Sequence, residues 1–124
     1  MSRKVLVVDD NKDFSDMLSH FLDTLGYKVD IATSAKQGLK KADCFQPDLI
    51  VVDIIMPSMD GYDFLRELNK NSNDAKVIAV SGGGWLDKKE YLQTAELLGA
   101  DYSFSKPFQS LSDFGSKVEE LLSA

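Results

Sequence analysis

The stretch from Leu49 to Gly61, which reads LIVVDIIMPSMDG, is the most informative part of the sequence. Its first four residues are apolar and rich in β-branched side chains, which is typical of a strand buried on both faces. Asp53 ends this run, and Pro57 and the Met-Asp-Gly at 59–61 then favour a turn. A carboxylate at the tip of a buried strand needs solvent, a partner or a ligand. Asp53 is therefore either a cap for the following loop or a functional carboxylate, and this stretch alone leaves both interpretations open.

The composition is that of one globular domain and argues against several classes of partner. The chain has 124 residues, of which 44% are hydrophobic and 27% are charged. Its formal net charge of −6 argues against a nucleic-acid-binding surface and provides no basic stripe for a membrane. No apolar run approaches the roughly 18 residues of a membrane-spanning helix, and the N-terminal apolar run is too short for a secretory signal. We therefore expect a cytoplasmic protein.

Cysteine and histidine each occur once, which limits the chemistry that the chain can perform. A single cysteine, Cys44, excludes a disulfide framework and a cysteine metal cluster, and we expect a small buried or half-buried apolar residue. His20 lies among Asp16, Ser19 and Asp23 on the polar face of a predicted helix. We therefore expect His20 to be a solvated surface residue and neither a metal ligand nor a base.

Five strand-like runs alternate with five helical patterns along the chain. The strands are predicted at residues 5–8, 27–32, 49–52, 77–80 and 101–105, with 27–32 at a sheet edge because apolar and polar residues alternate there. The helices are predicted after Asn11, after Ser34, around residues 64–68, at about 87–98 and around residues 111–122. The first helix has an apolar face formed by Phe14, Met17, Leu18, Phe21, Leu22 and Leu25. This alternation indicates parallel βαβ units in a doubly wound α/β fold.

Parallel winding brings the C-terminal ends of the strands to one edge of the sheet, where polar side chains follow four of them. Three carboxylates at that edge repel one another unless a cation or a proton intervenes. No histidine or cysteine is available there, so the ligands are all oxygen, and few protein ligands with room for waters suit Mg²⁺ or Mn²⁺ better than Ca²⁺ or zinc. One carboxylate is then free to attack phosphorus, with a hydroxyl and an ammonium as donors to the phosphoryl oxygens. These residues are Asp9, Asp10, Asp53, Ser81 and Lys106.

Four segments make the sequence resemble the receiver domain of two-component response regulators, in the CheY-like superfamily. They are VLVVDDN at 5–11, VVDIIMPSMDG at 51–61, VIAVSG at 77–82 and GAD…SKPF ending at Phe108. The resemblance implies a single receiver domain over residues 1–124. It also implies a flavodoxin-like (βα)5 three-layer sandwich with a parallel sheet in the strand order 2-1-3-4-5.

The resemblance further implies roles for the residues at the strand ends. Asp53 is similar to the phosphoacceptor aspartate, and Asp9 and Asp10 are similar to the acidic pair that binds Mg²⁺. The family's remaining protein ligand is a backbone carbonyl two residues past the acceptor, here that of Ile55.

Two further positions match the family, and one departs from it. Ser81 matches the hydroxyl that contacts the phosphoryl group, and Lys106 matches the family's lysine, followed by Pro107 through a bond that is typically cis. Receivers usually carry Tyr or Phe three residues before that lysine, whereas this chain has Ser103, and Tyr102 is expected to face the opposite side. We therefore expect the aromatic switch to be missing or rerouted through the glycine triplet at 82–84 and Trp85.

The resemblance implies a signalling switch rather than an enzyme acting on an external substrate. A histidine kinase or phosphotransfer protein is expected to donate a phosphoryl group to Asp53 in a Mg²⁺-dependent reaction, which the domain itself later reverses by hydrolysis. The fourth helix, fifth strand and fifth helix are expected to form the surface that controls a downstream protein.

Three alternatives stand beside this interpretation. A Mg²⁺ phosphatase with an aspartyl nucleophile needs a second carboxylate where this chain has Ile55. A degenerate receiver that acts only as a binding module would lack an acidic, hydroxyl or lysine position, and all are present. Because the sequence stops soon after the last helix, we expect a stand-alone regulator, the alternative being a receiver from a hybrid histidine kinase or a transcription factor.

Overall fold

The computed structural model describes residues 3–54, 61–70, 74–82, 96–97, 99–106, 108 and 110–123. Its centre is a five-stranded sheet in the order β2-β1-β3-β4-β5, in which every neighbouring pair is parallel. The strands are β1 (Lys4–Val8), β2 (Lys28–Ala32), β3 (Leu49–Asp53), β4 (Lys76–Gly82) and β5 (Tyr102–Lys106). The doubly wound α/β fold and the strand order 2-1-3-4-5 are therefore confirmed.

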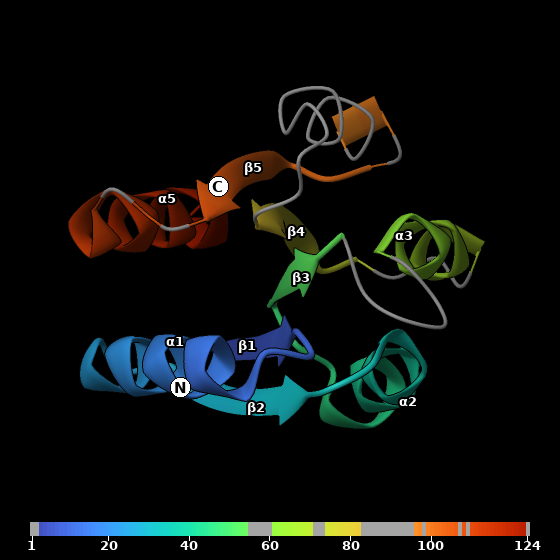
Figure 1. The fold of residues 1–124 in the computed structure, drawn as a ribbon, viewed down its shortest axis with the longest axis horizontal. Coiled ribbons are helices and arrows are strands. Elements are labelled where there is room, and N and C mark those ends of the chain that lie inside the picture. Colours follow the sequence, from blue (N-terminus) through green and yellow to red (C-terminus); the bar gives the residue numbers. More distant parts are fainter. Residues whose placement is uncertain are drawn as a thin grey trace.

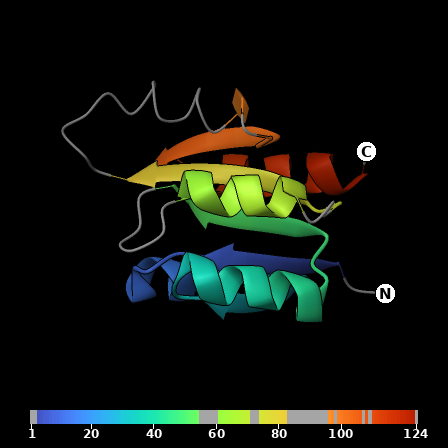
Figure 2. The same ribbon diagram turned by 90° about the vertical axis from the view of Figure 1, so that its right-hand side faces the viewer.

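Helices cover both faces of this sheet and make a three-layer arrangement. The helices are α1 (Lys12–Thr24), α2 (Ala35–Phe45), α3 (Gly61–Lys70) and α5 (Leu111–Ser123). Figure 1 shows α1 and α5 on one side of the sheet and α2 and α3 on the other, and Figure 2 views the sheet from the side of α2 and α3. The helix predicted at about 87–98 and the turn predicted at 57–61 fall almost entirely outside the described residues. None of the described helices is both long and apolar enough to cross a membrane.

Two apolar cores lie between the layers because successive side chains of each strand point to opposite faces. In β1, Leu6 and Val8 pack in the core beneath α2 and α3, whereas Val5 and Val7 pack beneath α1 and α5. Strand β3 is buried along its whole length, and edge strand β2 is mostly half-buried. The continuous apolar run at 49–52 and the alternating run at 27–32 therefore predicted the places of these strands correctly.

Helix α1 has the capping residues that the sequence predicts, but its buried face differs in part from the predicted one. The Asn11 side chain accepts a hydrogen bond from the backbone N–H of Phe14, and Gly26, at φ +93°, follows the helix. Met17 and Leu25 are exposed, whereas Ser15 is buried. The prediction was therefore wrong at these border positions, because the neighbouring elements cover a narrower and slightly rotated stripe centred on Leu18 and Leu22.

Helix α2 contains Cys44, whose predicted burial differs from the structure. It begins after the predicted cap, Ser34, whose side chain accepts a hydrogen bond from the backbone N–H of Gln37. Its buried positions are Ala35, Gly38 and Ala42. Cys44 lies off this face and is exposed, so its expected burial was wrong.

Candidate functional site

The candidate site lies at the C-terminal ends of β1, β3, β4 and β5. Val8 pairs with Val52. Asp9, which follows β1, therefore lies beside Asp53, the last residue of β3. Across the other edge of β3, Asp53 pairs with Val80, the residue before Ser81. Gly82 pairs with Lys106, which brings the last residue of β5 to the same end of the sheet. The parallel register alone therefore brings together polar residues at the C-terminal ends of four strands.

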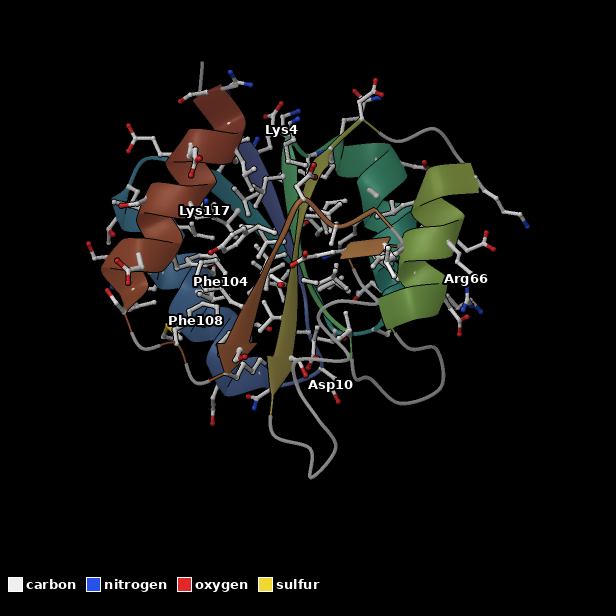
Figure 3. All side chains as sticks on the ribbon, turned by 90° about the horizontal axis from the view of Figure 1, so that it is seen from above. Lys4, Asp10, Arg66, Phe104, Phe108 and Lys117 are labelled. Carbon is white, nitrogen blue, oxygen red and sulfur yellow. The ribbon has the colours of Figure 1, made fainter. Side chains whose placement is uncertain are left out.

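Three carboxylates converge there. Asp9, Asp10 and Asp53 offer one oxygen each, and these oxygens lie within 4.8 Å of one another. Asp9 is 2% exposed and Asp53 6%, whereas Asp10 is exposed. Figure 3 shows Asp10 at the strand-end side of the sheet. This cluster could bind a metal ion, and its all-oxygen donor set and partial exposure suit Mg²⁺ or Mn²⁺.

Lys106 provides a positive charge within this acidic group. Its Nζ atom lies 2.6 Å from Oδ2 of Asp9 and 3.3 Å from Oδ2 of Asp53. The second Asp9 oxygen accepts a hydrogen bond from the backbone N–H of Asn11 at 2.9 Å. Buried carboxylates are tolerated when a cation and hydrogen-bond donors compensate the lost solvation, and these contacts provide both.

Ser81 supplies a buried hydroxyl group that has no hydrogen-bond partner among the described residues. The residue is fully buried in β4. A buried hydroxyl without a partner lowers stability, so its presence calls for an explanation. An incoming group with acceptor oxygens would satisfy this hydroxyl.

Several predicted site features fall outside the described residues. They are the carbonyl of Ile55, Pro107 and the segment that contains Trp85.

At the position where receivers usually carry an aromatic residue, the Ser103 hydroxyl donates a hydrogen bond to Oε1 of Glu96 at 2.7 Å. Tyr102 instead packs edge-on against Phe104, and the ammonium of Lys117 on α5 lies 4.2 Å from its ring centroid. The expectation that Tyr102 and Ser103 face opposite sides is therefore confirmed.

Two residues at the site were not predicted from the sequence, Phe14 and Ser15. The ammonium of Lys106 lies 4.0 Å from the ring centroid of Phe14, which had been expected only to face the core. The sequence did contain a signal for this contact. Phe14 falls in the first turn of α1, and this helix begins shortly after the acidic pair Asp9 and Asp10. Ser15 was missed as well, and its hydroxyl donates a hydrogen bond to the carbonyl of Asp9 at 3.3 Å.

Comparisons with known proteins agree with this geometry. A sequence model of the family described as "Response regulator receiver domain" matches residues 5–116. The chain is 32% identical to the alkaline phosphatase synthesis transcriptional regulatory protein PhoP of Bacillus subtilis (strain 168), over 98% of this chain and 49% of that protein. It is 37% identical to the chemotaxis protein CheY of Treponema pallidum (strain Nichols), over 84% of this chain and 72% of that protein. The chain thus spans about half the length of the first curated relatives that it matches.

Solved structures show the same similarity. The receiver domain of the Francisella response regulator 1452 superposes with a TM-score of 0.88 at 30% identity, over 98% of both chains. Receiver domains of two-component signalling are signalling proteins that work with histidine kinases and downstream effectors, and they are generally Mg²⁺-dependent. The family match, the strand order and the polar residues at the strand ends lead to one conclusion. This chain belongs to the response regulator receiver domain family.

Proposed function

We propose that the chain is a phosphorylation-dependent switch whose phosphoacceptor is Asp53. The observation that carries the proposal is the surroundings of the Asp53 carboxylate. It is buried and lies 3.3 Å from the Lys106 ammonium. It also belongs to the strand next to β4, which holds the hydroxyl of Ser81, a group with no partner among the described residues. A carboxylate that served only to cap a loop would need neither of these donors.

The proposed reaction transfers a phosphoryl group from a phosphohistidine of a histidine kinase or phosphotransfer protein. An oxygen of Asp53 attacks phosphorus in line, an O–P bond forms, and the P–N bond to the imidazole breaks. The released imidazole leaves with the electron pair of that bond and takes a proton. Lys106 and Ser81 donate to the phosphoryl oxygens, so that the growing negative charge meets preorganised donors. Hydrolysis of the aspartyl phosphate by the domain itself returns the starting state.

Asp9, Asp10 and Asp53 are the described residues that would hold Mg²⁺, together with the proposed carbonyl of Ile55. When bound, Mg²⁺ neutralises part of the carboxylate charge and polarises phosphoryl oxygens. The fit of these residues to a cation is supported by the close approach of their oxygens and by the ammonium that already lies among them. Mn²⁺ suits the same ligand set.

The proposed output surface includes β5 and α5, together with the helix that the sequence predicts at about 87–98. Ser103 stands where receivers usually carry an aromatic residue. We therefore propose that residues 82–86, which include Trp85, carry the conformational change instead. A Ser103→Tyr variant tests this route. It would be contradicted if that variant signalled like wild type and left the fluorescence response of Trp85 to phosphorylation unchanged.

The setting of the domain is open to two proposals, a stand-alone regulator or a receiver within a hybrid histidine kinase or transcription factor. Neither changes the chemistry at Asp53.

Intact-mass measurement after incubation with a small phosphodonor, with and without Mg²⁺, tests the proposed function. We expect wild type to gain one phosphoryl group only with Mg²⁺, and Asp53→Asn to gain none. Asp43→Asn is the matched control, since Asp43 is an exposed carboxylate on α2 and should leave the gain intact. A wild-type chain without the added mass, or an Asp53→Asn chain with it, would refute the proposal.

A further inference from the structure

Lys106 makes two kinds of contact, ion pairs with carboxylates and a cation–π contact with an aromatic ring. Its ammonium contacts the carboxylates of Asp9 and Asp53, and it also lies 4.0 Å from the ring centroid of Phe14. A cation at this distance from the face of an aromatic ring is attracted by the ring's negative face, and the attraction is stronger where solvent is largely excluded. The ring of Phe14 is therefore a further partner of the ammonium, contributed by α1.

The two kinds of contact respond differently to the proposed reaction. Lysine has a flexible four-carbon stem, and fixing its ammonium costs side-chain entropy. The contacts to Asp9 and Asp53 would change when Asp53 gains a phosphoryl group or when the carboxylates bind a metal ion. The Phe14 ring keeps its charge distribution throughout, so its attraction for the ammonium persists while the carboxylate partners change.

Phe14 is itself anchored. Its backbone N–H donates to Oδ1 of Asn11 at 3.1 Å, which fixes it in the first turn of α1. Its ring meets that of Phe108 edge-on, with centroids 5.4 Å apart, and Phe108 stacks on the fully buried Phe114 at 4.8 Å. Figure 3 shows Phe104 and Phe108 between the sheet and α5. The aromatic contacts therefore connect Lys106 with the core beneath α1 and α5.

We propose that Phe14 is a positioning residue, whose ring holds the ammonium of Lys106 at Asp53 and so speeds phosphoryl transfer. The inference rests on the proposed function of Asp53 and adds a residue from α1 to it.

Three variants distinguish the attraction between the Phe14 ring and the Lys106 ammonium from apolar packing alone. Phe14→Leu keeps an apolar side chain but removes the ring, and Phe14→Tyr keeps the ring. Phe104→Leu is the matched control, because Phe104 contacts Phe108 and Phe114 but has no described contact with Lys106. We expect Phe14→Leu to slow phosphorylation by a small phosphodonor about three- to tenfold. We expect Phe14→Tyr and Phe104→Leu to stay within about twofold of wild type.

A second measurement reports the contact without any reaction. In the unphosphorylated protein, the ring current of Phe14 should shift the ε-methylene protons of Lys106 upfield in the NMR spectrum. We expect Phe14→Leu to lose this shift, and Phe14→Tyr and Phe104→Leu to keep it. Urea unfolding of each variant establishes that rates are compared on folded protein.

The outcomes distinguish the two proposals. If wild type is phosphorylated and Phe14→Leu reacts equally fast, or if the upfield shift survives in Phe14→Leu, the role of Phe14 is overturned and that of Asp53 stands. If wild type takes no phosphoryl group, the proposed function fails, and the role of Phe14 in transfer fails with it. Equal slowing by Phe14→Leu and Phe104→Leu would reduce Phe14 to a packing residue and would also overturn the inference.

Discussion

The ammonium of Lys106 lies 2.6 Å from the Asp9 carboxylate, and this ion pair is almost closed to solvent, with side chains 14% and 2% exposed. The two residues are 97 positions apart, so the pair joins the last residue of β5 to the end of β1 across the strand-end edge. A buried ion pair adds little net stability because both charges lose water. Removing one partner is costly, because the other charge then stays buried without compensation.

Lys106→Met should therefore lower the free energy of unfolding by about 2–4 kcal/mol at neutral pH, since Asp9 and Asp53 lose their described cation. Urea unfolding measures the loss. Lys117→Met is the control, because Lys117 pairs with the mostly exposed Glu120 on the surface of α5. Equal losses of unfolding free energy in the two variants would contradict the prediction that breaking the buried Lys106–Asp9 pair costs more than breaking a surface pair.

Asp10→Asn should weaken binding of Mg²⁺ without harming the fold. Asp10 is exposed, so its replacement should change stability little, whereas one of three converging carboxylate ligands is lost. The rise of the unfolding midpoint with added Mg²⁺ reports binding to the folded state. We expect this rise in wild type and a smaller rise in Asp10→Asn. Asp13→Asn, a nearby exposed carboxylate outside the cluster, should behave like wild type, and the same Mg²⁺ response in all three proteins would argue against the metal site.

Much of the fold was predictable because three strands are near-continuous apolar runs, each followed by a polar residue. A strand such as β3 can be buried on both faces only in a sheet that helices cover on both sides. The borders of helix faces were less predictable. Met17 and Ser15 are both near the edge of the apolar stripe of α1, and only the packing decides that Ser15 is buried and Met17 exposed.

The sequence predicted which residues meet at the strand ends, but not all of their side-chain contacts. Parallel register requires Asp9 and Asp53 to be neighbours, whatever the rotamers are. The contact between Lys106 and Phe14 depends on a long side chain's conformation and on where α1 lies over the sheet. Sequence periodicity places Phe14 on the inward face of a helix but does not identify the residue that its ring meets.

Ser81→Ala should separate function from stability. The Ser81 hydroxyl is buried without a described partner, so its removal should leave the free energy of unfolding unchanged or slightly higher. Phosphorylation by a small phosphodonor should nevertheless slow, because one donor to the phosphoryl oxygens is lost. Ser15→Ala is the contrasting control, and the loss of its bond to the Asp9 carbonyl should lower stability by about 1 kcal/mol. A marked loss of stability in Ser81→Ala would show that the hydroxyl has a structural partner.

Gly38→Ala should destabilise the protein although alanine favours helices. A Cβ atom at Gly38 would lie 2.9 Å from Cγ2 of Val8 and 3.0 Å from Cε2 of Phe64, both fully buried. We expect a loss of about 1–3 kcal/mol from this overpacking between α2, β1 and α3. In Gly115→Ala on α5 the nearest atoms are 3.2 Å away at the end of the Phe21 ring, so helix propensity should offset most of the cost. Thermal and urea unfolding compare the two variants, and an equal or larger loss in Gly115→Ala would contradict the packing argument.

Tyr27 should make stability depend on pH in the alkaline range. Burial raises the pKa of the Tyr27 hydroxyl above its usual value of 10.0, and the Glu119 carboxylate raises it further, while Arg3 opposes both. The unfolded chain therefore loses this proton at lower pH than the folded chain does. The resulting stabilisation is fully present below about pH 10 and is lost as the pH rises toward the pKa of the folded state.

Tyr27→Phe removes this titration while keeping the ring, so its free energy of unfolding should fall less than that of wild type between about pH 9 and pH 11. Urea unfolding at several pH values measures the difference, and tyrosinate absorbance reports the ionisation itself. Glu119→Gln removes the second cause of the raised pKa but leaves the burial, so its pH dependence should lie between those of the other two proteins. A parallel fall of stability in wild type and Tyr27→Phe would mean that Tyr27 ionises equally readily in the folded and unfolded chains.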